Sequence, residues 1–323
     1  MATSHVSKVA LIGCGIMGAP IAGHILDAGY QLTVHTRTRA KAEGLIARGA
    51  RWADTPAEAA RDADLVLTMV GEPTDVEDVY FGSNGVLEAA PVGSYLVDLT
   101  TSSPQLAREL HDAAEVMDKH AFDCPVTGGE EGAIAGTLTL IVGADETYAA
   151  PVMDVLSTFA GKVYYFDHAG AGQSAKLCNQ VSLSACMIGW ADAVALAQAS
   201  GVDAARMLEM VSAGMGGATA LARLAPRALE GDYAPGFFSA YLRKDLGLAL
   251  AEAEDLDLAL PGAETGFMMY DTICEAGGGR LGTQAISLLY GDDDAAVAAG
   301  LDWSLLQVAD EDEHDHDHHH HHH

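Results

Sequence analysis

The sequence predicts an α/β protein in which an N-terminal, doubly wound parallel sheet is followed by an all-helical C-terminal domain. In the first half, short β-branched and apolar runs alternate with helical stretches, which is the pattern of a parallel sheet covered on both faces. After about residue 168 the strand signals stop, and long stretches rich in Ala and Leu follow. The 323 residues are enough for two domains of ordinary size.

The first domain is expected to span residues 1–167. Its strands are expected where Val, Leu, Ile and Tyr are concentrated, at 9–13, 31–36, 64–70, 94–100, 121–126, 137–143 and 162–166. Helices are expected between them, at about 16–28, 38–48, 56–61, 74–80, 104–118 and 146–159. This alternation predicts βαβ units, whose strands run in parallel.

The second domain is expected to span residues 168–309. The run from Gln173 to Ser200 is rich in Ala, Leu and Val and has no proline, so it predicts one long buried helix. Further helices are expected at about 203–213, 217–230, 239–255, 262–275 and 283–290. Residues 310–317 form an acidic run, DEDEHDHD, and residues 318–323 are six consecutive histidines; we interpret them as an acidic tail and a purification tag.

The composition is strongly acidic. Against 17 lysines and arginines the chain has 46 aspartates and glutamates, which gives a formal net charge of −29. Such a surface repels phosphate backbones and anionic lipids, so we expect neither nucleic acid nor a membrane as a partner. A high-salt environment, in which counterions screen the self-repulsion, is a further hypothesis.

We expect no membrane span, no signal peptide, no disulfide bonds and no cysteine metal site. No apolar stretch has the length of about 20 residues that spans a bilayer, and the N-terminus lacks the basic and apolar regions of a signal peptide. The five cysteines are scattered, without the spacing of a metal site or of paired disulfides. We therefore expect a cytoplasmic protein with reduced thiols and no metal.

A glycine-rich turn follows the first expected strand. Gly13, Gly15 and Gly18, with Ile16 and Met17 before the last of them, form a GxGxxG pattern that joins a strand to a helix, and all five are expected to contact a dinucleotide. The first glycine allows the tight turn, the second lets backbone N–H groups approach a pyrophosphate, and the third lets helix and strand pack closely. The helix N-terminus adds a positive partial charge. This context predicts a Rossmann dinucleotide site; a glycine turn without a ligand is the alternative.

The end of the second expected strand indicates which dinucleotide binds. An NAD site usually places Asp or Glu there. This chain instead has Thr36, Arg37 and Thr38, whose guanidinium and hydroxyl groups suit a 2′-phosphate. We therefore expect NADP as the cofactor, with NADPH preferred over NADH. The alternative is that Arg37 only stacks on the adenine, which would leave the selectivity weak.

Two more loops are expected to line the cofactor. Met69 and Val70 end the third expected strand, and Thr101 follows the fourth. In a doubly wound sheet the ligand lies in a crevice beyond the carboxyl ends of the strands, where these residues fall. Ordinary loop residues remain the alternative for each of them.

Four motifs occur in order along the chain: GCGIMGAPIAGHILDAG at 13–29, DCPVTGGEEGAIAGTLTLIVG at 123–143, GAGQSAKLCNQ at 170–180 and KDL at 244–246. Together they resemble the β-hydroxyacid dehydrogenase family, which includes 3-hydroxyisobutyrate dehydrogenases and tartronate semialdehyde reductases. The resemblance covers residues 6–290. It implies an NAD(P)-dependent 3-hydroxyacid dehydrogenase with Lys176 as the residue that transfers the proton.

The chemistry of hydride transfer supports this role for Lys176. Oxidation of an alcohol needs a base for the hydroxyl proton, and the reverse reaction needs an acid. Gln173, Lys176 and Asn179 are spaced three residues apart and share one face of the long helix. Asn179 is expected to orient the substrate or Lys176 by hydrogen bonding. A solvated lysine on a helix surface is the alternative.

A second segment is expected to bind the carboxylate of the substrate. Thr127, Gly128 and Gly129 follow a strand, and the glycines there can expose consecutive N–H groups to an anion. The resemblance implies that this segment anchors the acid group, usually with Ser where Thr127 stands. Glu130 and Glu131 come next and are expected to point outward, because they would repel an anion.

Lys244 and Asp245 complete the expected site. The resemblance implies that Lys244 lies near the nicotinamide and the substrate and that Asp245 supports it, whereas a surface charge pair is the alternative.

The expected function is hydride transfer between NADP(H) and a small 3-hydroxy acid or semialdehyde. An imine reductase-like enzyme and a non-catalytic dinucleotide sensor are the alternatives, and the presence of Lys176 disfavours both. The apolar long helix also predicts a homodimer or homotetramer.

Overall fold

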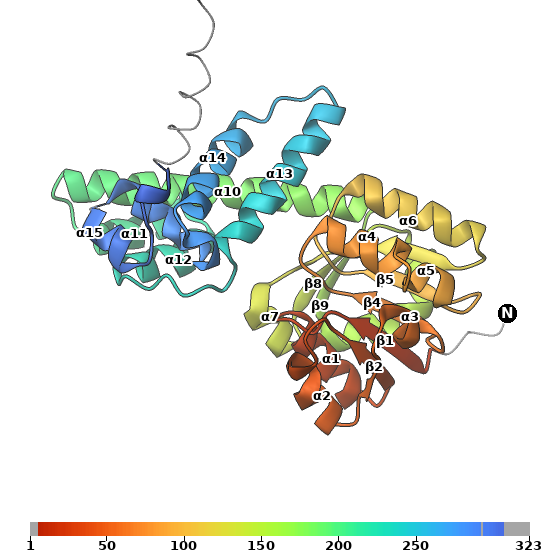
Figure 1. The fold of residues 1–323 in the computed structure, drawn as a ribbon. Coiled ribbons are helices and arrows are strands. Elements are labelled where there is room, and N and C mark those ends of the chain that lie inside the picture. The colour runs from red at the N-terminus through yellow and green to blue at the C-terminus, as the bar shows by residue number, and fades with distance from the viewer. Residues whose placement is uncertain (1–5, 292, 307–323) are drawn as a thin grey trace, which may run out of the picture. The chain divides into compact units, whose positions relative to one another are not determined.

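Two compact units make up the described chain. The computed structural model describes residues 6–291 and 293–306, and the chain divides between Leu177 and Cys178 (Figure 1). The boundary expected between residues 167 and 168 stays a prediction. The expected acidic tail and tag at 310–323 lie outside the described residues.

The main sheet of the first unit is parallel throughout. Its strands occur in the order β3-β2-β1-β4-β5-β6, which is the order of a Rossmann sheet wound in both directions from its first strand. The predicted doubly wound sheet is therefore confirmed. The strands are β1 (Lys8–Ile12), β2 (Gln31–His35), β3 (Arg51–Trp52), β4 (Leu65–Thr68), β5 (Tyr95–Asp98) and β6 (His120–Asp123).

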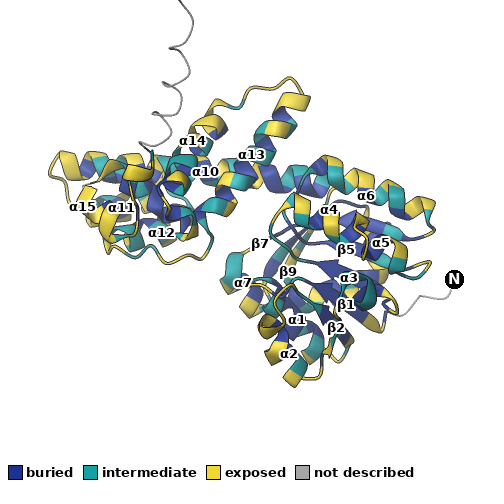
Figure 2. Cartoon of the chain, in the orientation of Figure 1, coloured by how far each residue is buried: buried dark blue, intermediate teal, exposed yellow. Residues whose placement is uncertain are grey.

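Each face of this sheet has its own apolar core. Along β4, Leu65 and Leu67 belong to one core with α1 and the second sheet, whereas Val66 belongs to the other core with α3 to α6. Figure 2 shows the strands buried between these layers. The α-helices of the unit are α1 (Gly18–Asp27), α2 (Glu43–Ala47), α3 (Pro56–Ala60), α4 (Pro73–Phe81), α5 (Val86–Ala89), α6 (Pro104–Val116), α7 (Gly129–Ala135), α8 (Glu146–Ala149) and α9 (Met153–Leu156). Its 3₁₀ helices are η1 (Arg39–Ala42), η2 (Ala150–Val152) and η3 (Ser157–Phe159).

A second, smaller sheet holds the strands that follow β6. In it β7 (Val126–Thr127) is antiparallel to β8 (Leu138–Val142), and β8 is parallel to β9 (Ala160–Tyr165). The prediction of one strand over 121–126 was wrong, because β6 ends at Asp123 and the chain then changes sheets. Pro125 explains the break, since proline has no N–H for a strand ladder and restricts the residue before it.

Helices pack around one core in the second unit. The long helix α10 (Ala171–Ala199) crosses the division of the chain, and its Met187, Trp190 and Val194 lie in that core. The predicted helical second half is confirmed for the described residues. The other helices are α11 (Ala204–Ala213), α12 (Thr219–Leu229), α13 (Ser239–Asp255), α14 (Pro261–Glu275), η4 (Gly278–Arg280), η5 (Thr283–Tyr290) and α15 (Asp293–Ala298).

By length and composition alone, α10 is a candidate for crossing a membrane, although the sequence analysis expected no such stretch. A helix in the core of a globular protein is apolar for the same reason, because its side chains leave water. The part of α10 in the second unit packs in this way against the later helices. The length and apolar composition of α10 are therefore only weak evidence for a membrane span.

Several short elements differ from the expectation. The sequence analysis did not predict α5, α7 or α15, and the helix expected at 283–290 is a 3₁₀ helix, η5. In α7, Gly129 and Gly132 lower the helix propensity of a segment for which no helix was expected. Elements this short carry too few turns for a periodic apolar pattern to appear.

Candidate active site

The loop between β1 and α1 is shaped by close contacts of the backbone. Gly13 has a φ of +99°, and its N–H donates to the carbonyl of His35 at 2.9 Å. A Cβ on Gly13 would lie 2.1 Å from the carbonyl oxygen of Met69, and one on Gly18 would lie 1.8 Å from that of Gly13. Neither glycine can carry a side chain unless the backbone moves.

Gly15 differs from its neighbours, because a Cβ there would meet no protein atom within 4 Å. The protein itself does not require a glycine at this position, whereas a ligand that approaches the backbone does. Beside it Ile16 is exposed, and Met17 provides no side-chain cap for the first N–H groups of α1. The loop thus fits the pyrophosphate of a dinucleotide.

Arg37 extends from the loop after β2, with 86% of its side chain exposed. Its guanidinium lies 3.2 Å from one carboxylate oxygen of Asp75, whose other oxygen accepts the N–H of Glu72 at the start of α4. Arg39 instead lies over the ring of Trp52, 5.3 Å from its centroid. The sequence analysis did not identify Asp75, because it is distant from Arg37 in the chain.

The other expected cofactor residues lie at the carboxyl ends of neighbouring strands. Thr36 and Thr38 follow β2, Met69 and Val70 follow β4, and Thr101 comes after β5. Because β2, β1, β4 and β5 are adjacent and parallel, these residues lie along one edge of the sheet. All five are exposed or half-buried, as residues that contact a ligand must be.

The expected substrate segment forms the turn between β7 and α7. Thr127 is half-buried at the end of β7. Gly128 has a φ of +135° and Gly129 a φ of +63°, so two successive residues adopt a conformation that glycine takes without strain. Glu131 is exposed, as expected, whereas Glu130 is half-buried.

The start of α10 is bonded to the loops that follow β5 and β6. The carboxylate of Asp123 accepts the N–H groups of Gly170 and Gln173, both at 2.7 Å. The side chain of Gln173 accepts the N–H of Ser102 at 2.9 Å and donates to the carbonyl of Thr100 at 2.7 Å. Asp123 and Gln173 are both buried. The sequence analysis placed Gln173 near the site and missed Asp123.

Lys176 lies about one helical turn after Gln173 and is only 6% exposed. All six lysines belong to the part of the chain that the structure describes, and Lys119 is the only other buried one. Lys119 donates to the backbone carbonyls of Leu87 and Glu88, which accounts for its burial. The burial of Lys176 does not fit a solvated surface lysine.

In the second unit, two hydrogen bonds and an ion pair join the other expected residues. The amide of Asn179 donates to Gln180 at 2.9 Å, and the amide of Gln180 donates to Asp245 at 2.6 Å. The ammonium of Lys244 lies 3.2 Å from the second carboxylate oxygen of Asp245. Because Asp245 is 1% exposed and only 14% of the Lys244 side chain is exposed, this is not a solvated surface pair. The sequence analysis did not select Gln180.

A third buried carboxylate, that of Asp98, lies at the end of β5. Asp98 accepts the hydroxyl of Thr68 at 2.7 Å and the N–H of Thr100 at 3.0 Å, and the Thr100 hydroxyl accepts the N–H of Val70 at 3.0 Å. Burial raises the pKa of Asp98 to about 6; the bonds from Thr68 and Thr100 oppose this rise, and the charge of Asp123 adds to it. Asp98 thus fixes the ends of β4 and β5, and the only sequence signal for it was an aspartate at a strand end.

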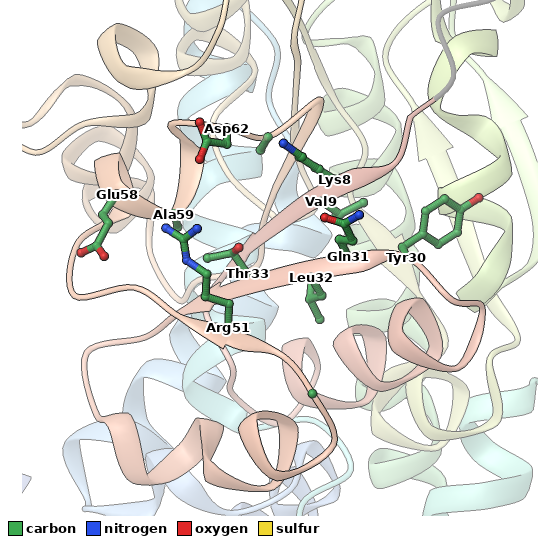
Figure 3. Close-up of a pocket in the computed structure, with 12 residues that line it drawn as sticks. Lys8, Val9, Tyr30, Gln31, Leu32, Thr33, Arg51, Glu58, Ala59 and Asp62 are labelled. Carbon is green, nitrogen blue, oxygen red and sulfur yellow. The ribbon is translucent and has the colours of Figure 1, made fainter.

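A cavity of about 440 Å³ lies at the opposite edge of the sheet (Figure 3). It is formed at the amino ends of β1 and β2 and beside α3, and its charged lining consists of Lys8, Arg51, Glu58 and Asp62. The two cations and two carboxylates of the lining cancel in formal charge. Dinucleotides bind at the carboxyl ends of such sheets, and the cavity is therefore separate from the candidate site.

The sequence matches two protein-family models, one in each half of the chain. The model described as the NAD binding domain of 6-phosphogluconate dehydrogenase matches residues 8–167. The model described as NAD-binding of NADP-dependent 3-hydroxyisobutyrate dehydrogenase matches residues 170–290. The first match contains the glycine loop, and the second contains Lys176, Asn179 and Lys244.

Individual relatives agree with these matches. An uncharacterized oxidoreductase of Bacillus subtilis is 42% identical over 87% of this chain and 98% of its own length. The 3-hydroxyisobutyrate dehydrogenase of Pseudomonas aeruginosa is 34% identical over 79% of this chain and 88% of its own. A solved structure of Mycobacterium tuberculosis 3-hydroxyisobutyrate dehydrogenase with L-serine is 31% identical, with a TM-score of 0.83, and the match covers 89% of this chain and 100% of that one. The chain therefore belongs to the β-hydroxyacid dehydrogenase family, as its four motifs predicted.

Proposed function

We propose that the protein is an NADP-dependent dehydrogenase that transfers a hydride between NADP(H) and a small 3-hydroxy acid or the matching semialdehyde. The observation that carries the proposal is the burial of Lys176 on a helix whose start is bonded to the loops after β5 and β6. Those loops lie at the same edge of the sheet as the loops expected to hold the dinucleotide. The class of reaction, hydride transfer to or from a hydroxy acid, is taken from the β-hydroxyacid dehydrogenase family to which the chain belongs.

Lys176 is proposed as the general acid and base. In the oxidation, its neutral amino group takes the proton of the substrate hydroxyl; in the reduction, its ammonium returns a proton to the carbonyl oxygen. The nicotinamide, when bound, accepts or supplies the hydride. Burial supports this role, because a proton at Nζ is then exchanged with the substrate rather than with bulk water.

The carboxylate of the substrate is proposed to bind at Thr127, Gly128 and Gly129. The two successive positive φ angles support this, because such turns direct backbone N–H groups toward an anion. The hydroxyl of Thr127 offers one more donor.

Asn179 and Lys244 are proposed to contact the substrate, and Lys244 also the cofactor. Both side chains are held by buried partners, Asn179 through Gln180 and Lys244 by Asp245. A side chain that is held in this way loses less entropy when it binds a ligand. Asp245 is then the residue that keeps Lys244 in place.

Turnover measurements test the reaction and its proton-transfer residue together. Nicotinamide absorbance is followed with a panel of 3-hydroxy acids that includes 3-hydroxyisobutyrate and L-serine, and with the matching semialdehydes. Lys176→Ala is expected to lower kcat by about 10²–10⁴-fold, the usual contribution of general acid–base catalysis. Lys162→Ala, which removes an exposed lysine of β9, is the matched control and should retain full turnover.

The other outcomes of this experiment have distinct meanings. Full turnover in Lys176→Ala would remove Lys176 from the chemistry. Tight NADPH binding by the wild type without turnover of any 3-hydroxy acid would indicate an imine substrate or a dinucleotide sensor.

The preference for NADPH is proposed to depend on Arg37. Arg37→Ala is expected to lower the ratio of kcat/KM for NADPH over NADH at least tenfold, because a charge-assisted contact to a phosphate contributes about 1.5–3 kcal/mol. Asp75→Asn, which releases the guanidinium from its 3.2 Å contact, should keep or raise the ratio. Arg39→Ala, which removes the contact with Trp52, is the control. An unchanged ratio in Arg37→Ala would reject the assignment.

A homodimer or homotetramer is proposed for the assembled protein. Large apolar side chains are exposed in the second unit, among them Leu196 at 71%, Met210 at 67% and Leu256 at 66%. Light scattering at micromolar concentration should give a multiple of the 33.6 kDa chain mass. The mass of a single chain would contradict the proposal.

A further inference from the structure

Asp123 is a buried carboxylate for which the proposed reaction has no direct use. It ends β6 and is 2% exposed. Burial raises its pKa, whereas the N–H groups of Gly170 and Gln173 and the charge of His168 lower it. A carboxylate is costly to bury unless it is well bonded, so its contacts indicate what it does in this fold.

Both oxygens of this carboxylate bind the start of α10. Oδ1 accepts the N–H of Gly170, which directly precedes the helix, and Oδ2 accepts that of Gln173 in the first turn, each at 2.7 Å. The first N–H groups of a helix have no partner inside it and are usually bonded by a residue next to the helix. Here they are bonded by a side chain 47 and 50 positions earlier in the chain.

Two glycines enclose the carboxylate. The three nearest contacts of a Cβ on Gly143 would all be carboxyl atoms of Asp123, the closest at 2.2 Å. A Cβ on Gly172, inside the first turn of α10, would lie 2.6 Å from the carbonyl oxygen of Ile141 and 2.8 Å from Oδ2 of Asp123. The carboxylate therefore fills the space that a side chain at Gly143 would take and part of the space that one at Gly172 would take.

We propose that Asp123 is a positioning residue that anchors the first turn of α10 to the end of β6 and thereby fixes Lys176 at the carboxyl edge of the sheet. At a rise of about 1.5 Å per residue, Lys176 lies roughly 4.5 Å along the helix axis from Gln173. One helical turn is stiff over this length, so a displacement of Gln173 moves Lys176 with it. The bonds from the Gln173 side chain to Ser102 and Thr100 add a second attachment.

The inference rests on the proposed function only for its effect on turnover. The placement of Lys176 can be measured without a substrate, by the rate at which formaldehyde and cyanoborohydride methylate its amino group. Mass spectrometry of peptides then gives this rate for each lysine separately. Lys162 is exposed and Lys119 is buried elsewhere in the same unit, so both serve as internal controls.

Asp123→Asn is the first variant to test. It keeps the size of the side chain but replaces one acceptor oxygen with an NH₂ group, which cannot accept the N–H of Gly170 or Gln173. Lys176 is expected to be methylated at least fivefold faster than in the wild type, with Lys162 and Lys119 unchanged. An unchanged rate at Lys176 would overturn the inference, and so would an equal acceleration at Lys119, which would indicate general loosening.

Gly143→Ala tests the same contact from the opposite side. Its methyl group would meet only the Asp123 carboxyl among its nearest neighbours, so it should displace that group and accelerate the methylation of Lys176 in the same way. If Lys176 were methylated in this variant at the same rate as in the wild type, that result would contradict the anchoring role of Asp123.

Turnover gives a second readout once a substrate is known. In Asp123→Asn, kcat should fall at least 30-fold while the Kd for NADPH changes less than threefold, and the primary deuterium isotope effect on hydride transfer should rise. A loss of active protein alone would lower kcat without changing the isotope effect, and would count against the inference. A wild type that turns over no 3-hydroxy acid would reject the proposed function and leave the methylation result standing.

Discussion

At the scale of single residues, the three glycines of the first loop meet two different requirements. The protein's own backbone requires Gly13 and Gly18, because carbonyl oxygens lie 2.1 Å and 1.8 Å from where their Cβ atoms would be. A Cβ on Gly15 would meet no protein atom within 4 Å, so the fold does not require this glycine, whereas an approaching ligand would. The GxGxxG motif therefore combines two glycines that the fold requires with one that an approaching ligand would require, and the structure shows which is which.

This difference predicts opposite behaviour for two alanine variants. Gly15→Ala should unfold at the wild-type temperature without cofactor but bind NADPH at least tenfold more weakly, because the methyl group occupies the path of the pyrophosphate. Gly18→Ala should lower the stability of the protein itself, by about 1–3 kcal/mol or more, because backbone must move. Thermal unfolding with and without NADPH measures both. Equal destabilisation of the two apo variants would contradict this interpretation.

The buried carboxyl of Asp98 predicts a pH dependence of stability. Its pKa is about 6 in the folded protein against an ordinary 3.8, so the folded state holds the proton more tightly than the unfolded chain. The free energy of unfolding should therefore fall as the pH rises from about 4 to about 6, by an amount on the order of 3 kcal/mol.

Asp98→Asn isolates this contribution. The amide oxygen can still accept from Thr68 and Thr100, but the group no longer titrates. Denaturant unfolding at pH 4 and pH 7 should show the variant gaining stability relative to the wild type at the higher pH. A difference that is the same at both pH values would show that Asp98 does not titrate in this range.

At the scale of elements, the helices differ in how their first turns are bonded. α3, α6 and α11 begin with local caps, since Thr55, Ser103 and Asp203 each accept an N–H three residues later. Such caps are visible in a sequence because the residue and its helix are adjacent. The helix α10 was predicted at 173–200 and is observed at 171–199. The bond from its first turn to Asp123 was not predicted, because the bonded residues are far apart in the chain.

The local cap of α6 predicts a measurable contribution to stability. The hydroxyl of Ser103 accepts the N–H of Leu106 at 3.2 Å, and Ser103→Ala should cost about 1 kcal/mol in the free energy of unfolding. Ser103→Asp keeps an acceptor and adds a charge that favours a helix N-terminus, so it should cost little or nothing. Urea denaturation of both variants measures this. A loss in Ser103→Asp as large as that in Ser103→Ala would show that the cap contributes nothing.

At the scale of the whole molecule, the net charge of −29 dominates the interaction with solvent. The free energy of unfolding is expected to rise from low salt to molar KCl, because the screening length falls from about 10 Å at 0.1 M to about 3 Å at 1 M and the carboxylates repel one another less. Thermal unfolding over a KCl series measures this. A protein without residues 310–323 is the control and should respond similarly, because most of the acidic residues lie before that run. A stability that does not rise with KCl would remove the support for a high-salt environment.

The sequence by itself determined the parallel sheet, the glycine loop, the long helix with Lys176 and the family. Apolar runs, helix periodicity and the order of motifs can each be recognised from the residues in their order along the chain. Only the tertiary structure decided that β7 joins a second sheet, and that Asp75, Asp98, Asp123 and Gln180 each bond a residue distant in the chain. These residues act on partners 30 to 65 positions away in the chain. Folding brings such partners together, so a local pattern in the sequence does not show which residues they bond.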